Sequence, residues 1–82
     1  MTLEIRFFAG AAEAAGRESL LLDVAPEQSV AGVVETVVGD DARLARVLDA
    51  SALLLDGTRV TDRAATVGAA TQLDVLPPFA GG

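Results

Sequence analysis

Each strand-like segment of this chain has a single apolar side, which narrows the folds open to 82 residues. In residues 3–8 the apolar side chains of Leu3, Ile5 and Phe7 recur at every second position, as in a half-buried strand. Phe8 departs from this alternation, because it is apolar at a position where a polar residue is expected. Further strand segments are expected at residues 18–24, 52–57, 58–61 and 71–76. Because a one-sided strand must bury its apolar side, we expect a mixed sheet covered on one face.

One valine-rich segment can cover that sheet. Ser29 is a typical helix N-cap, and Gly39 can end the helix. Between them the valines recur at helical spacing: Val30, Val33, Val34, Val37 and Val38. Each valine costs a helix about 0.5 kcal/mol relative to alanine, but burial of its side chain contributes roughly 1.5 kcal/mol or more. Contact with the sheet can outweigh the poor propensity, so we predict one main helix here.

Three shorter signals complete the order of elements. The segment GAAEAAGR indicates a helical turn that Gly16 can end. Asp40 or Asp41 can cap a second short helix, ARLARVLD, whose arginines point outward. Asp56-Gly57 is a hairpin signal. The prediction is a small α+β roll spanning residues 1–76, followed by an extended, flexible tail over residues 77–82.

The residue inventory excludes most catalytic chemistry. The chain has no cysteine, histidine or lysine, which rules out thiolate and imidazole metal sites, Ser–His–Asp systems and a P-loop lysine. The serines lack a base: Ser19, Ser29 and Ser51. Asp40 and Asp41 are interpreted as helix caps and not as metal ligands, so no metal site is expected. Gly10 to Gly16 is not a phosphate-binding loop.

Charge and hydropathy set the expected partners and location. The net charge is −6, so nucleic acid is not expected as a partner, because its phosphates require clustered basic residues. A protein with a basic groove would be attracted, although the charge can equally serve solubility alone. No apolar run approaches 18 residues, so neither a signal peptide nor a membrane span is expected, and a cytoplasmic location is predicted.

The last six residues carry the functional signal. Pro77 and Pro78 fix the backbone in an extended form, which lowers the entropic cost of ordering the tail. Gly81 and Gly82 have no side chains, so the terminal carboxylate could pass along a channel too narrow for any Cβ. Joined to AMP as a mixed anhydride, that carboxylate becomes an electrophile that a sulfur nucleophile can attack to give a thiocarboxylate. The chain has no groups for these steps, so an activating enzyme must supply ATP, magnesium and catalysis.

These motifs together resemble a known family. FFAGAAEAAG after the first strand, DG before TRVT, and LPPFAGG at the end resemble the molybdopterin synthase small subunit (MoaD type), within the MoaD/ThiS group of ubiquitin-like sulfur carriers. The resemblance covers essentially the whole chain. It implies a β-grasp, ubiquitin-like fold with a C-terminal Gly-Gly tail.

The resemblance also implies a role for each tail residue. An E1-like enzyme would adenylate Gly82, and sulfur from a sulfurtransferase would convert it to a thiocarboxylate. Pro77, Pro78, Phe79, Ala80 and Gly81 would then insert into the large synthase subunit, where Gly82 gives sulfur to the cyclic pyranopterin precursor of the molybdenum cofactor. The chain would be a non-catalytic, sulfur-donating subunit that binds no cofactor itself.

Two turns depart from the family pattern. The family commonly has Asn where this chain has Asp56, and Asp also suits such a turn. The family has a glycine-containing turn before the last strand, where this chain has Ala69-Ala70-Thr71. The geometry of this second turn is therefore open.

The same strands predict a partner surface at the root of the tail. If Leu3, Ile5 and Phe7 face the helix, then Phe8 lies on the opposite side of the sheet, and so does Leu76. The first and last strands of a β-grasp sheet are neighbours, so Phe8, Leu76 and Phe79 could form an exposed apolar patch typical of an interface. The alternative is that Phe8 folds under the alanine-rich turn.

Other functions remain open at this point. The tail chemistry also suits a sulfur carrier for thiamine, cysteine or thiolated tRNA, although the endings of thiamine carriers usually lack Pro-Pro. A ubiquitin-like modifier would instead join its carboxylate to lysines of target proteins. A plain interaction domain would carry Gly81 and Gly82 incidentally.

Overall fold

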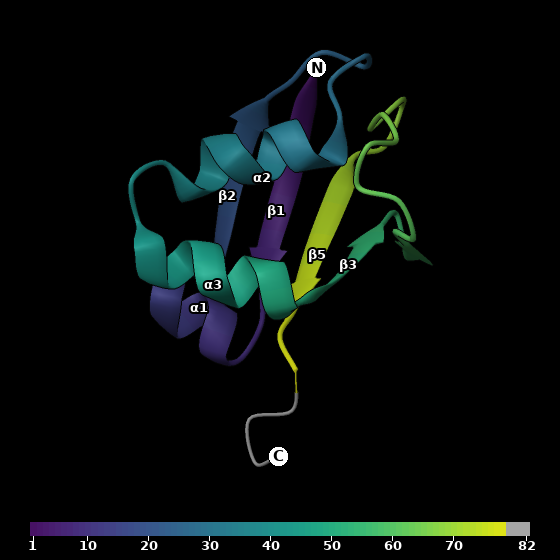
Figure 1. The fold of residues 1–82 in the computed structure, drawn as a ribbon. Helices are drawn as coiled ribbons and strands as arrows, with labels where there is room; N and C mark the ends of the chain where they lie inside the picture. The colour runs from purple at the N-terminus through teal and green to yellow at the C-terminus, as the bar shows by residue number, and fades with distance from the viewer. Residues whose placement is uncertain (79–82) are drawn as a thin grey trace.

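The fold is a five-stranded mixed sheet with α2 and α3 lying across one face, seen in a computed structural model that describes residues 1–78 (Figure 1). The strands are β1 (Thr2–Phe7), β2 (Ser19–Asp23), β3 (Ala52–Leu55), β4 (Thr58–Arg59) and β5 (Gln72–Leu76). The helices of this part of the chain are α1 (Gly10–Ala15), α2 (Val30–Val38) and α3 (Ala42–Ala50). The α+β β-grasp architecture predicted from the sequence is confirmed.

The first and last strands pair in parallel near the centre of the sheet. The strand order is β2-β1-β5-β3-β4, and β1 pairs with β5 in the register Ile5↔Leu73 and Phe7↔Val75. The other neighbouring strands are antiparallel. β5 therefore has a hydrogen-bonded partner on each side, while β2 and β4 form the two edges.

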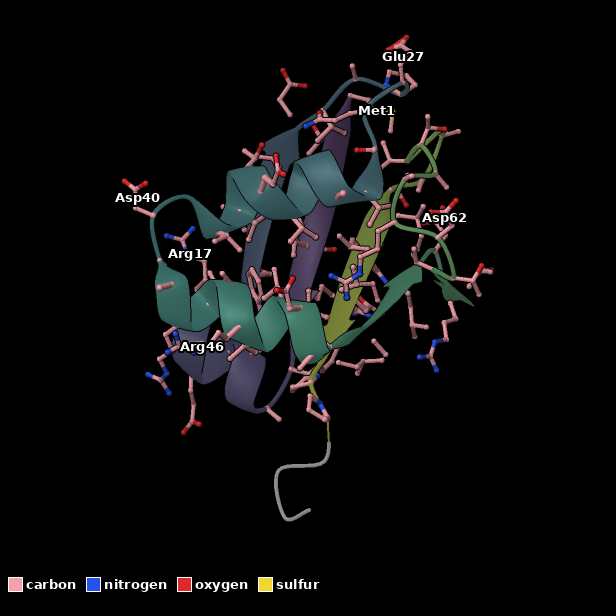
Figure 2. All side chains as sticks on the ribbon, in the orientation of Figure 1. Met1, Arg17, Glu27, Asp40, Arg46 and Asp62 are labelled. Atoms are coloured by element: carbon pink, nitrogen blue, oxygen red, sulfur yellow. The ribbon has the colours of Figure 1, made fainter. Side chains whose placement is uncertain are left out.

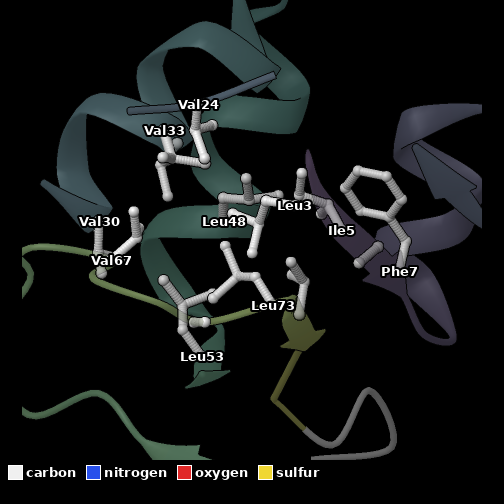
Figure 3. Packing of buried hydrophobic residues seen from close by; sticks show 14 of the residues in the cluster. Leu3, Ile5, Phe7, Val24, Val30, Val33, Leu48, Leu53, Val67 and Leu73 are labelled. Carbon is white, nitrogen blue, oxygen red and sulfur yellow. The ribbon is translucent and has the colours of Figure 1, made fainter. Parts of the chain in front are cut away.

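The predicted alternation places the core between the sheet and the helices. The side chains that point inward from β1 and β5 are buried, and Figure 3 shows several of them packed together: Leu3, Ile5, Phe7, Leu73 and Val75. The valine-rich segment is a helix whose inward face is also buried: Val30, Val33 and Val34. Burial against the sheet has overridden the low helix propensity of valine, as expected.

The helical layer is wider than one main helix. Leu44 and Leu48 of α3 are buried in the same core, and Ala11 of α1 joins them. Five strands about 4.8 Å apart span roughly 19 Å, whereas one helix is about 10–12 Å across. A single helix cannot cover such a sheet, so α3 covers the part that α2 leaves open.

Side-chain and glycine caps begin and end the helices where the sequence predicts. Ser29 Oγ accepts a hydrogen bond from the Gly32 amide at 2.9 Å, and Asp41 Oδ1 accepts one from the Leu44 amide at 3.0 Å. Of the two candidate caps of α3, Asp41 thus takes the role. Gly16 ends α1 in the left-handed conformation.

Asp56 organises both turns that depart from the family pattern. Asp56 and Gly57 have φ values of 48° and 83°, which confirms the predicted hairpin turn. Asp56 Oδ1 also accepts hydrogen bonds from the amides of Thr71 and Gln72, each at 3.0 Å. It therefore holds the start of β5. The left-handed residue of the second turn region is Gly68, with φ 59°, so the glycine lies two positions before Ala70.

Arg63 ties the long loop before β5 to the end of α3. Its Nη2 donates hydrogen bonds to the carbonyl oxygens of Leu48 at 3.0 Å and Ser51 at 2.8 Å. These carbonyls lie at the helix C-terminus, where backbone acceptors have no helical partner and a positive charge is favourable. The loop is thereby held against the helical layer.

We predict that Asp56→Ala lowers the free energy of unfolding by about 2 kcal/mol, because the left-handed backbone is unfavourable for alanine and the amides of Thr71 and Gln72 lose their acceptor. Urea denaturation monitored by circular dichroism measures the change. Asp56→Asn is the matched control, since asparagine keeps the acceptor and tolerates this conformation, and it should stay within about 0.5 kcal/mol of the parent. Equal losses in both variants would contradict this role.

Replacement of Arg63 tests the link between the loop and α3. We expect Arg63→Ala to lower the free energy of unfolding by about 1–2 kcal/mol, because two carbonyl acceptors lose a charged donor. Arg59→Ala is the control, since Arg59 is an exposed arginine on the edge strand β4. In thermal denaturation the Arg63→Ala variant should have the lower unfolding midpoint. Similar midpoints in the two variants would contradict this role of Arg63.

Candidate functional site at the root of the tail

The final strand brings the C-terminal segment to one end of the domain. β5 ends at Leu76, and the chain continues through the half-buried Pro77 and the exposed Pro78. Figure 1 shows that the chain leaves β5 beside α3, at the end of the molecule where α1 lies. The predicted tail residues Phe79, Ala80, Gly81 and Gly82 lie outside the described residues, so their roles stay predictions.

Phe8 and Leu76 lie on the outer face of the sheet, as their positions predict. The Phe8 amide donates a hydrogen bond to the Val75 carbonyl at 3.2 Å, which continues the β1–β5 pairing beyond Phe7. Both residues have the opposite parity to the buried apolar residues of their strands. The structure thus brings two members of the predicted apolar patch together, and the third member, Phe79, lies outside the described residues.

The aromatic ring of Phe8 remains at the surface. The residue is 37% exposed, and the Arg6 guanidinium lies 5.5 Å from the ring centroid, within the range of a cation–π contact. Ala9, which follows, has φ 49° and turns the backbone into α1. The Phe8 side chain is therefore partly exposed on the outer face of the sheet, next to Ala9 and Ala12 of the alanine-rich turn.

A bidentate ion pair fixes the sheet next to this patch. Arg6 Nε and Nη2 donate hydrogen bonds to the two carboxylate oxygens of Asp74, at 2.8 and 3.2 Å. Asp74 is only 7% exposed, whereas the Arg6 side chain is half-buried. The hydrogen bond that Arg6 donates to Asp74 raises the pKa of Arg6, against the opposing effect of desolvation. Arg6 therefore stays charged and holds β1 and β5 in register beneath the Phe8 ring.

The Arg6–Asp74 pair was not predicted from the sequence. A signal for it exists, because Arg6 and Asp74 occupy outward positions on the first and last strands. Once those strands are taken as parallel neighbours, opposite charges at facing positions indicate a pair. The missing information was the register, which sets Arg6 directly beside Asp74.

The hydroxyl groups of two serines form hydrogen bonds with the backbone at helix ends. Ser29 Oγ caps α2, and the Ser51 hydroxyl donates a hydrogen bond to the Val47 carbonyl at 2.6 Å. Within residues 1–78, no group of three or more acidic side chains is placed to hold a metal ion. The same residues contain no helix that is long and apolar enough to cross a membrane.

Comparisons with solved structures give close matches over the whole fold. The Haloferax volcanii HVO 2177 protein is 31% identical, with 100% of this chain and 87% of that chain aligned at a TM-score of 0.77. The small archaeal modifier protein 1 of Haloferax volcanii is 27% identical over 100% of both chains, with a TM-score of 0.82. No protein-family model and no curated protein matches the chain.

A third match concerns a two-protein assembly. In the Helicobacter pylori complex of subunits 1 and 2 of the molybdopterin-converting factor, the matching chain is 18% identical over 100% of both chains, with a TM-score of 0.69. At this identity the match supports the fold alone. The chain therefore shares the ubiquitin-like β-grasp fold of small archaeal modifier proteins and of molybdopterin-converting subunits, which agrees with the resemblance to the MoaD/ThiS group seen in the sequence.

Proposed function

We propose that this chain is a sulfur carrier that works through its C-terminal carboxylate, as the small subunit of a molybdopterin synthase. One observation carries the proposal. The last strand is held on both sides within the sheet, and Pro77-Pro78 then lead directly into Phe-Ala-Gly-Gly. The folded body thus offers a rigid base for a terminus whose last two residues have no side chains to obstruct a narrow channel.

The chemistry would proceed in two steps on Gly82. The carboxylate attacks the α-phosphorus of ATP and displaces pyrophosphate, which gives an acyl adenylate. A sulfide-level sulfur from a sulfurtransferase then attacks the acyl carbon, so a C–S bond forms while the C–O bond to AMP breaks. An E1-like enzyme with magnesium would catalyse the first step, because the sequence has no cysteine, histidine or lysine and residues 1–78 hold no group of three or more side chains that could bind a metal ion. The thiocarboxylate sulfur then bonds to a carbon of the cyclic pyranopterin precursor and displaces an oxygen substituent, and water cleaves the acyl C–S bond, which leaves the sulfur on the pterin and restores the Gly82 carboxylate.

The outer-face patch supports an interaction with the large synthase subunit. Phe8 and Leu76 lie beside the start of the tail, so a protein that covers them also receives the terminus. Exposed aromatic side chains of this kind are enriched at protein interfaces. The Helicobacter pylori protein of the same fold forms a complex with subunit 2 of its converting factor, which supports the same type of partner here.

A second function is favoured by the sequence identities. The small archaeal modifier protein 1 is 27% identical to this chain, compared with 18% for the molybdopterin-converting subunit. A modifier would use the same activated Gly82 but transfer it to a lysine amine of a target protein, forming an isopeptide bond. Carriers for thiamine, cysteine or thiolated tRNA would share the first steps and differ in the acceptor.

Intact-mass measurement on the chain purified from its native host distinguishes these functions. We expect a fraction of the protein to carry sulfur in place of one terminal oxygen. A modifier would instead yield peptides in which a lysine of another protein is joined to Gly82. If neither species is present, including in cells growing on molybdenum-dependent metabolism, the terminus is not a site of acyl activation and the proposal fails.

Deletion of Gly82 provides the matched control. The shortened chain should stay folded, with an unchanged circular dichroism spectrum, because the deletion lies beyond β5. It should lose all sulfur transfer when mixed with the large subunit, the activating enzyme and the pterin precursor. A plain interaction domain would retain its activity after this deletion.

Substitution of Phe8 tests the partner surface. We expect Phe8→Ser to weaken binding to the large subunit by roughly tenfold or more, measured by calorimetry, because it removes an exposed aromatic side chain that the partner would cover. Leu21→Ser is the control. Leu21 is 69% exposed on the same face, but it lies on the edge strand β2, separated from β5 by β1. Equal affinities for the two variants would contradict the assignment of the patch.

A further inference from the structure

A groove lies where the chain leaves the fold, between α1, α3 and the two prolines. Its volume is about 370 Å³, within the roughly 300–1,000 Å³ that is usual for ligand-binding sites. Three separate segments supply the side chains that matter here: Glu13 from α1, Arg43, Arg46 and Val47 from α3, and Pro77 and Pro78 from the start of the tail. The walls are therefore apolar, with charged groups at the rim.

The α3 side of the groove is a continuous stripe. Arg43, Arg46, Val47 and Ala50 are spaced by three and four residues, so they share one face of the helix. Figure 2 shows Arg46 where α3 lies next to α1. Within residues 1–78, neither arginine belongs to an ion pair. Two guanidinium groups against the single carboxylate of Glu13 make this rim positive on a chain whose net charge is −6.

We propose that this groove is a docking site for the chain's own last four residues, 79–82. The ring of Phe79 would lie against Val47 and the prolines, and the Gly82 carboxylate would lie against Arg43 and Arg46. Four residues reach about 14 Å when extended, and they start at Pro78, which already forms one wall. Because the segment is tethered beside the groove, its effective concentration there is on the order of millimolar.

The composition of the segment matches the groove at both ends. An aromatic side chain suits the apolar wall, and a carboxylate suits the paired guanidinium groups. The Glu13 carboxylate repels the Gly82 carboxylate, and both arginines are exposed. The docking is therefore weak, reversible and sensitive to salt. The docked state withholds the terminus from other proteins, and release returns it.

Nuclear magnetic resonance on the full-length chain tests the docking directly. We expect nuclear Overhauser contacts between the Phe79 ring and the Val47 methyl groups in the parent chain. In the double variant Arg43→Gln/Arg46→Gln these contacts should weaken, and the amide signals of Gly81 and Gly82 should move toward those of the free peptide Phe-Ala-Gly-Gly. Raised salt should move the parent signals in the same direction.

Two single variants test the direction in which the Gly81 and Gly82 signals move. Glu13→Gln removes the opposing carboxylate and should move the Gly81 and Gly82 signals away from the free-peptide values. Arg59→Gln, on the edge strand β4, should leave them unchanged. The proposal is overturned if the parent chain shows no contact between Phe79 and Val47, or if the Gly81 and Gly82 signals are the same in the double variant and the parent. Binding of an acidic partner segment in the groove of a chain with a free tail would also overturn it.

The docking stands apart from the sulfur chemistry, since the magnetic resonance measurements use this chain alone. Its functional consequence is measured separately, as the rate at which an activating enzyme adenylates Gly82. The double variant should react roughly two- to fivefold faster at limiting enzyme, because apparent affinity scales with the fraction of free tail. Unchanged rates with intact Phe79 contacts would show that docking does not control activation.

Discussion

The parallel pairing of β1 with β5 joins the two ends of the chain at the centre of the sheet, and the other elements are arranged around it. The pairing is held on the inner side by buried leucine, isoleucine and valine side chains, and on the outer side by the Arg6–Asp74 pair. β2 extends the sheet from β1, and β3 extends it from β5. Pro77 and Pro78, the side chains of Phe8 and Leu76, and the groove all lie at the end where this central pairing stops.

Features with a local cause were predictable from the sequence. The alternation of Leu3, Ile5 and Phe7, the Ser29 and Asp41 caps and the Asp56-Gly57 turn each depend on residues within a few positions of one another. Such signals act through backbone preferences and one-sided burial, which do not require knowledge of the partner. The fold class followed from their order.

Features that depend on long-range contact were not predictable in the same way. Arg6 and Asp74 are 68 positions apart, and their pairing requires the register of two strands. The bonds from Arg63 to the end of α3 require the path of a long loop. The wider helical layer follows from the width of the sheet, which only the number of paired strands determines.

The same distinction between local and long-range causes applies to the candidate site. The proposed chemistry of the tail rests on the residue types at its end and stays a prediction. The position of Phe8 and Leu76 on one face followed from strand parity once the first and last strands were taken as neighbours. The groove could not be anticipated, because it depends on how α1 and α3 pack beside Pro77 and Pro78.

The position of β5 between two partners has a mechanical consequence. A protein that draws the terminus into a channel pulls along β5, and this load acts as shear on the hydrogen bonds to β1 and β3. In shear the bonds of a ladder resist together, whereas an edge strand peeled from its end would lose them one at a time. The domain can therefore bear repeated pulling at its C-terminal end without unfolding.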